Sequence, residues 1–294
     1  MRTSAPLLQL EKPGGFVAID ESLLTGQAGM CDLFVLFTPS SASLALRERL
    51  TRRFIAAETL LAGDEPNESG PAFIREVLKR SQVFRLNAHR KTTVAVSHPF
   101  ISLLPSGLIR TGDENSLLRF TVSRNDLIAL STMVSGFDLQ VVFGLPPEEE
   151  SLIRQLIPGC SITHSIAAAL EHGKLAGTPR SMALRVIAHP GILSVVGLSG
   201  KKLSFANVFP VADTEEAVYH LLNVAEQLEA DRNSLPVQIE GSASACDALM
   251  ERLAIFFSNV RLADTRIFPL LSNKLKELPA ASILPILTVS LCES

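Results

Sequence analysis

The chain has 294 residues, of which 47% are hydrophobic and 19% charged, so it is long enough for one large domain or two lobes with a sizeable core. Its net charge of −3 gives no general attraction to nucleic acid or to an anionic membrane, and we expect neither as a partner. The longest apolar stretch, Pro279–Cys292, is too short to span a bilayer and is interrupted by Pro285. Membrane insertion is therefore not expected.

The cysteines and the N-terminal residues indicate in which cellular compartment we expect the protein. The four cysteines are widely separated, and no two of them form a CxxC pair, so zinc-binding spacing is absent. The N-terminus lacks the apolar region of a secretory signal peptide. We therefore expect a cytoplasmic protein with reduced, mostly buried thiols. The cysteines are Cys31, Cys160, Cys246 and Cys292.

The first half of the chain alternates between apolar runs and turn residues. Phe16–Ile19 is a candidate short edge strand, and the strongly apolar residues 32–37 predict a buried strand. Thr38, Pro39, Ser40 and Ser41 form the predicted turn after it. Further strands are predicted at residues 42–50, 53–60, 92–97 and 160–163, and helices at residues 71–80, 146–156 and 166–175.

Residues 99–144 lie outside this simple plan. They predict two strand pairs, of which the clearer joins residues 128–134 to residues 139–143 through a turn at Ser135 and Gly136. The glutamates at 148–150 follow two prolines and suit the exposed amides of a helix start, so a metal site is not expected there.

The second half repeats the order of the first. Strands are predicted at residues 183–188, 192–198, 203–211, 237–239 and 260–263, and helices after Asp213 and at residues 245–257. Asp213 and Glu216 have the spacing of a capping box. Leu221 and Leu222 belong to the stripe that we expect to face the sheet.

This repeated order resembles a ribonuclease H-like lobe. Two such lobes in tandem make the actin-like ATPase fold, an α/β architecture with a nucleotide cleft between the lobes. We therefore predict two lobes, each a mixed five-stranded sheet ordered 3-2-1-4-5 and carrying helices. The first, with an N-terminal extension and an insertion near 99–144, covers residues 1–177, and the second covers 178–294.

Four stretches also resemble one bacterial family, catalogued as domain of unknown function 3822, whose known members have the actin-like ATPase fold. They are residues 18–24, 93–99, 205–239 and 276–293. The resemblance implies a fold and no assigned activity. The placement of the insertion is similar to that in actin-like proteins that act as cytoplasmic scaffolds in bacterial division and type IV pilus assembly, and a fold alone does not imply function.

The resemblance also implies where a nucleotide site would lie. Actin-like ATPases carry an Asp-x-Gly turn after the first strand of each lobe, where the Asp positions metal or water and the Gly lets amides approach phosphate. The first turn has neither residue, and Pro39 removes an amide donor. The second keeps Gly191 but has His189 or Pro190 in place of the Asp. Actin-like ATPases also commonly have a Gly-Gly pair near the adenosine, after the fourth strand of the second lobe. Here Gly241 and Ser242 stand at that place, so only one of the two glycines is present.

We accordingly expect no catalytic residue, no metal site and no cofactor, with ATP kept as an alternative ligand. The candidate cleft residues for a cofactor are Ser40, Ser41, Gly191, Gly241 and Ser242. Our leading hypothesis is a non-catalytic scaffold with an unknown protein partner. An ATP-binding or ATP-hydrolysing protein with a degenerate site is the alternative, a small-molecule binder using the cleft is a third reading, and homodimerisation is left open.

Three other patterns have simpler structural interpretations. Arginines at 47, 49, 52 and 53 could form a basic patch, but we favour outward residues of a solvated hairpin. Asp20 and Glu21 could be a catalytic carboxylate pair, but we favour a turn that starts a helix. His98-Pro99 and His189-Pro190 follow strands that hold different positions in the two predicted lobes, so we interpret their similarity as coincidence.

Overall fold

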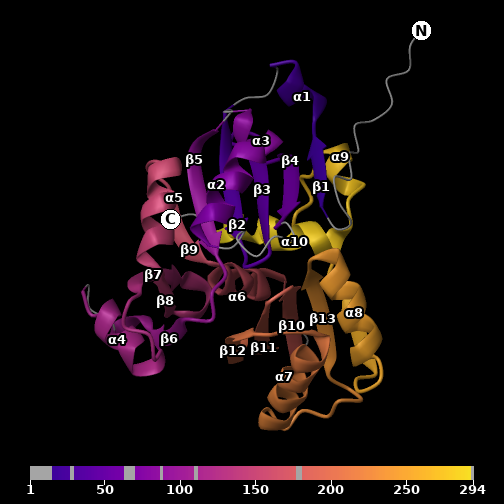
Figure 1. The fold of residues 1–294 in the computed structure, drawn as a ribbon. Helices are drawn as coiled ribbons and strands as arrows, with labels where there is room; N and C mark the ends of the chain where they lie inside the picture. Colours follow the sequence, from indigo (N-terminus) through magenta and orange to yellow (C-terminus); the bar gives the residue numbers. More distant parts are fainter. Residues whose placement is uncertain are drawn as a thin grey trace.

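The computed structural model describes residues 15–26, 30–62, 70–86, 89–108, 112–176 and 181–292. The predicted lobe boundary at residues 177–180 lies outside them, and so does most of the predicted N-terminal extension. Within them the chain forms two large sheets and one small one, flanked by helices (Figure 1).

The first lobe is built on a six-stranded sheet with the order β1-β4-β3-β2-β5-β9. Five of its strands have the predicted order 3-2-1-4-5, and the sixth is the candidate edge strand β1, which pairs antiparallel with β4. The strands are β1 (Phe16–Ile19), β2 (Cys31–Phe37), β3 (Ser41–Glu48), β4 (Phe54–Leu61), β5 (His89–Val96) and β9 (Ser161–His164).

The second lobe has a five-stranded sheet with the predicted order, β12-β11-β10-β13-β14. The first three strands are antiparallel, and β13 and β14 add in parallel. The strands are β10 (Met182–His189), β11 (Ile192–Ser199), β12 (Lys202–Pro210), β13 (Pro236–Gly241) and β14 (Asn259–Leu262). The predicted mixed α/β fold is confirmed.

Helices cover both faces of each sheet, and two of them cross between the lobes. Helix α6 ends the first lobe yet packs against β11 and β12, and α10 follows the second sheet in the chain yet packs against β2 and β3 (Figure 1). The helices are α1 (Glu21–Leu24), α2 (Pro71–Arg80), α3 (Gln82–Arg85), α4 (Glu114–Thr121), α5 (Pro147–Leu156), α6 (Ser165–Ala176), α7 (Thr214–Gln227), α8 (Ala243–Leu253), α9 (Asn273–Lys276) and α10 (Ala280–Thr288), with short 3-10 turns at Ser106–Leu108, Ser135–Phe137 and Val289–Cys292. No helix among the described residues is long and apolar enough to cross a membrane.

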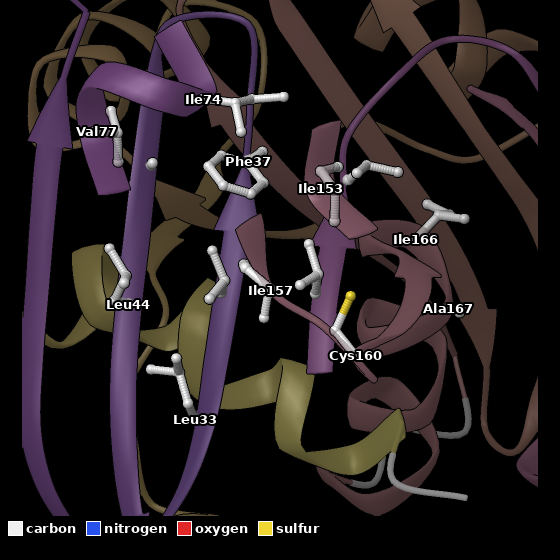
Figure 2. Close-up of a cluster of buried hydrophobic side chains, with 14 of the residues drawn as sticks. Leu33, Phe37, Leu44, Ile74, Val77, Ile153, Ile157, Cys160, Ile166 and Ala167 are labelled. Carbon is white, nitrogen blue, oxygen red and sulfur yellow. The ribbon is translucent and has the colours of Figure 1, made fainter. Parts of the chain in front are cut away.

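The alternation of side chains along β2 explains this layering. Leu33 and Phe37 join Leu44 and residues of α2 and α5 in one buried cluster (Figure 2). Phe34 and Leu36, on the opposite face, join residues of α10 in a second cluster. Because both faces are covered, β2 has no solvent face and is apolar almost throughout. A third cluster fills the space between the second sheet and helices α7 and α8.

The insertion forms a separate three-stranded sheet with the order β6-β8-β7. The predicted pair is present as β7 (Ile128–Val134) and β8 (Leu139–Leu145). The second predicted pair is wrong: β6 (Ile101–Pro105) is a single strand on the other edge of β8, and helix α4 follows it. Leu118 of α4 is buried where this helix packs on the sheet, so the segment is helical instead of pairing as a strand.

Two burial predictions need correction. Arg47 is only 4% exposed rather than outward, because α10 covers the face of β3 on which it lies. Its guanidinium lies 3.6 Å from Asp32 and 5.0 Å from the ring centre of Phe34. Leu221 is fully buried as predicted, whereas Leu222 is only partly buried because it lies at the edge of the α7 stripe.

The helix starts predicted from capping residues are present in the structure. Asp213 caps α7 by accepting a hydrogen bond from the Glu216 amide at 2.9 Å. The Glu216 carboxylate reaches back to the amide of Ala212 rather than that of Asp213, at 2.6 Å. Asp20 caps α1 through the Ser22 amide at 3.1 Å, so the carboxylate pair is a helix start, as we favoured. All four cysteines are free thiols.

Candidate functional site

The two turns that would flank a phosphate group touch each other. The Ser40 hydroxyl, in the β2–β3 turn, donates a hydrogen bond to the Pro190 carbonyl of the β10–β11 turn at 2.9 Å. A Cβ placed on Gly191 would lie 3.6 Å from the Pro39 side chain, which is ordinary van der Waals contact. The turns of the two lobes therefore meet at the place where the resemblance implies a nucleotide phosphate.

Ser41 is turned inward at this point. It is buried, its amide donates to the Thr38 hydroxyl at 3.0 Å, and the two hydroxyls lie 2.8 Å apart. These bonds close the β2–β3 turn from within, as serine and threonine side chains commonly do. The Ser41 hydroxyl is thus engaged inside its own turn.

Gly241 and Ser242 connect β13 to α8. Gly241 has φ +136°, and a Cβ there would lie 1.9 Å from the Ala188 carbonyl oxygen. The Ser242 amide donates to that same oxygen at 3.0 Å. Glycine is therefore needed for the close approach of two backbones, a structural reason that accounts for its presence without a ligand. Whether these residues bind a cofactor stays a prediction.

A small cavity with several polar side chains in its lining lies beside His189, the last residue of β10 before the second turn. Its volume is about 10 Å³, room for about one water molecule, and both lobes contribute to its lining. Ser97 and Ser165 come from the first lobe, and His189, Ser194 and Glu240 from the second. Among the described residues neither ring nitrogen of His189 has a hydrogen-bond partner, and burial lowers its pKa to about 4. The imidazole is therefore neutral at pH 7.

A buried ion pair continues from this cavity toward helix α6. Arg185 of β10 lies 3.0 Å from Glu240 of β13 and donates to His172 Nδ1 at 2.5 Å. Burial, followed by the charge of Arg185, lowers the pKa of His172 to about 3, so this ring accepts the bond in its neutral form. Burial raises the pKa of Glu240, and Arg185 opposes that effect. These residues form a polar connection between the lobes.

A larger cavity lies entirely in the second lobe. It has a volume of about 250 Å³ and is bounded by Gly191, by the first turn of α7 at Asp213 and Thr214, and by Ser244 and Ala248 of α8. Of the five candidate residues only Gly191 lines it. Two helix N-termini with their exposed amides meet here, which is the kind of place where an anion binds.

The sequence did not reveal a histidine cluster in the first lobe. His98 Nε2 lies 3.0 Å from a Glu149 carboxylate oxygen, and His164 Nε2 contacts both the amide and the carbonyl of His98, at 3.1 and 2.9 Å. Burial, followed by the charge of His98, lowers the pKa of His164 to about 3. The acidic run at 148–150 signalled a helix start, but nothing local signals a partner 51 residues away. No group of three or more metal-ligating side chains is present within the described ranges.

Comparison with solved structures supports the fold. A protein of Bacteroides thetaiotaomicron VPI-5482, described as having an actin-like ATPase fold and unknown function, superposes with a TM-score of 0.73 and 16% identity over 91% of this chain and 98% of that chain. The PilM–PilN type IV pilus biogenesis complex matches with a TM-score of 0.60 and 12% identity over 90% of this chain and 99% of that chain. At these identities the likeness is one of fold.

Sequence comparison places the chain in a family. No protein with curated function matches it. One family model, described as protein of unknown function (DUF3822), matches residues 20–260, which is most of the chain. The chain therefore belongs to the DUF3822 family and has the actin-like ATPase fold that the repeated order of its strands and helices predicted.

Proposed function

We propose that this protein is a non-catalytic member of the actin-like fold that acts as a cytoplasmic scaffold through protein–protein contact. The observation that carries the proposal is the contact between the two turns, Ser40 to Pro190 at 2.9 Å. The resemblance to actin-like ATPases implies that a nucleotide phosphate would lie between these two turns, where Ser40 and Pro190 are in contact. The turns also lack the carboxylate that holds Mg²⁺, and phosphoryl transfer depends on that ion for much of its catalysis.

The insertion is the surface that we assign to a protein partner. Leu108, Phe120 and Met133 are more than half exposed on it, and Phe120 is 88% exposed. These three side chains come from the Ser106–Leu108 turn, helix α4 and strand β7, and exposed apolar side chains are characteristic of interaction sites where they form one patch. A fold neighbour that is itself part of a two-protein complex, PilM–PilN, supports this choice by analogy of fold.

The test of the scaffold proposal compares two matched variants in the native cell. Phe120→Ser removes an exposed aromatic from the insertion, and Leu50→Ser removes an exposed leucine, 91% accessible, from the β3–β4 turn of the first lobe. Cross-linked partners are identified by mass spectrometry for both variants and the parent. We expect at least one partner to be lost only in Phe120→Ser. An identical set of partners in all three proteins would contradict the assignment to the insertion.

The nucleotide alternative rests on the cavity of about 250 Å³ in the second lobe, where Gly191 and the first turns of α7 and α8 meet. Purified protein is titrated with ATP with and without Mg²⁺, and phosphate release is followed. We expect no turnover above background. Steady release, or binding that tightens strongly with Mg²⁺, would promote the ATPase reading over the scaffold.

A matched pair of variants locates any nucleotide that does bind. Ala248→Leu fills the second-lobe cavity from helix α8, while Ala254→Leu makes the same change on the exposed residue that follows the helix. Binding that is lost only in Ala248→Leu places the nucleotide in this cavity. Binding that survives in both variants places the nucleotide elsewhere, and the second-lobe cavity would then no longer support the nucleotide alternative.

A further inference from the structure

A second interlobe cavity lies away from the touching turns, on the face of the second sheet that helix α6 covers. Its floor is a row of three polar residues on three neighbouring strands: Arg185 of β10 is in register with Gln238 of β13, which is in register with Arg261 of β14. Residues in register on adjacent strands lie on the same face of a sheet. The three side chains therefore stand side by side in a cavity of about 410 Å³.

The walls come from both lobes. His172 and Ala176 of α6 close one side, and Asp264, Arg266 and Ile267, in the segment after β14, close another. The Asp264 carboxylate is held by Arg266, whose Nε donates to it at 2.7 Å, and this bond is the main cause of the lowered pKa of Asp264. The Asp264 and Arg266 charges thus cancel within the wall.

The balance of charge in the cavity is positive. Arg185 is neutralised by Glu240 at 3.0 Å, and His172 is neutral because burial and Arg185 lower its pKa to about 3. Arg261 is exposed, and its charge contributes to the lowered pKa of Asp264. Asp264 is nevertheless paired with Arg266, and within the described ranges Arg261 is in no ion pair closer than 4.0 Å. One guanidinium charge therefore remains for a ligand.

Hydrogen bonding orients a second donor. Arg185 Nη2 donates to Gln238 Oε1 at 3.2 Å, which fixes the amide oxygen and leaves the amide nitrogen as a donor beside Arg261. A guanidinium fork next to an amide N–H suits the paired oxygens of a carboxylate or a phosphate. The volume falls in the range typical of small-molecule sites and exceeds what a bare anion fills.

We propose that this cavity binds a small molecule through a carboxylate or phosphate group held by Arg261 and Gln238. The bound molecule contacts α6 from the first lobe and β13 and β14 from the second, so it bridges the lobes at a point separate from the touching turns. This site is an addition to the scaffold role: it gives a protein without a nucleotide switch a place where a small anion stabilises one arrangement of the lobes.

The test uses inorganic phosphate and succinate as separate probes, titrated by calorimetry at constant ionic strength with chloride as the balancing ion. We expect saturable binding of one of them, and the two arms tell a phosphate site from a carboxylate site. Arg261→Gln should weaken that binding roughly ten- to hundredfold, the loss of one charge-assisted hydrogen-bonding group. Arg232→Gln, the same change at an exposed arginine elsewhere in the second lobe, should leave it unchanged.

A third variant guards against misfolding. Gln238→Glu keeps an oxygen for Arg185 but replaces the amide donor with a negative charge, so it should abolish anion binding while the unfolding transition stays cooperative. Saturable binding of neither probe to the parent protein would overturn the proposal. Equal affinity in Arg261→Gln and Arg232→Gln would do so too, because it would show that the anion binds outside the cavity.

Discussion

Replacing Gly241 with alanine should cost far more stability than its place at the end of a strand suggests. The added Cβ would lie 1.9 Å from the Ala188 carbonyl oxygen, whereas real Cβ contacts are essentially never shorter than 3.0 Å. The ends of β10 and β13 must therefore separate by roughly 1 Å, a distance that follows from that minimum contact. The shift breaks the hydrogen bond from the Ser242 amide to the same oxygen, now 3.0 Å long.

Two contributions make up the stability that Gly241→Ala should lose. A non-glycine residue held at φ +136° costs about 1–3 kcal/mol in backbone strain, and the lost hydrogen bond about 0.5–1.5 kcal/mol. We expect Gly241→Ala to lower the free energy of unfolding by about 1.5–4.5 kcal/mol in urea denaturation, with the slope m unchanged.

The matched control is Gly159→Ala. Gly159 also has a positive φ, +74°, but nothing lies within 4 Å of the added Cβ, so this variant isolates the backbone term of about 1–2 kcal/mol. If both variants lose the same stability, the close approach to Ala188 has no energetic weight and the reasoning fails. A destabilised Gly241 variant also cannot report on nucleotide binding, because its loss of ligand would follow from its loss of structure.

Three further outcomes are expected. Leu221→Ala should cost about 2–5 kcal/mol in chemical denaturation because this side chain of α7 is fully buried against the second sheet, and a loss below about 1 kcal/mol would show that the helix face is misassigned. Ser40→Ala should cost about 0.5–1.5 kcal/mol, the worth of one hydrogen bond between the turns, and phosphate release from Mg–ATP should stay at background. Burial lowers the folded-state pKa of His189 to about 4, below the ordinary value of 6.5 for histidine, so the stability that its neutral form contributes is present above pH 6.5 and falls as the pH is lowered from 6.5 toward 4. His189→Asn should reduce that slope in pH-dependent denaturation, and an unchanged slope would contradict the burial of a neutral ring.

The repeated strand order was visible in the sequence because each strand carries its own signal. The apolar run of β2 and the Asp213 cap of α7 are local patterns, and local patterns determine an element's type and its ends. The same reasoning failed where burial depends on a distant segment. No residue near Arg47 in the sequence indicates that helix α10, about 235 positions later, covers its face of the sheet. The alternating strand was therefore interpreted as half solvated.

The same distinction between local patterns and distant contacts applies to the candidate site. That the two turns lack Asp could be seen directly from the residues at 38–41 and 188–191. That they touch could not, because the contact joins Ser40 to a carbonyl 150 residues away. The His98–Glu149 pair and the row Arg185, Gln238 and Arg261 were missed for this reason, since strand register and lobe packing alone bring them together.

The crossing of α10 onto the first sheet has a consequence for synthesis of the chain. Phe34 and Ala45 are translated early, yet the residues that bury them, Ile283 and Leu284 among them, emerge from the ribosome only after all strands of the second sheet. Until then one face of the first sheet remains uncovered, which is the kind of surface that chaperones recognise and that aggregates. The two lobes are thus successive in sequence but not in folding: the first is completed only when the second is.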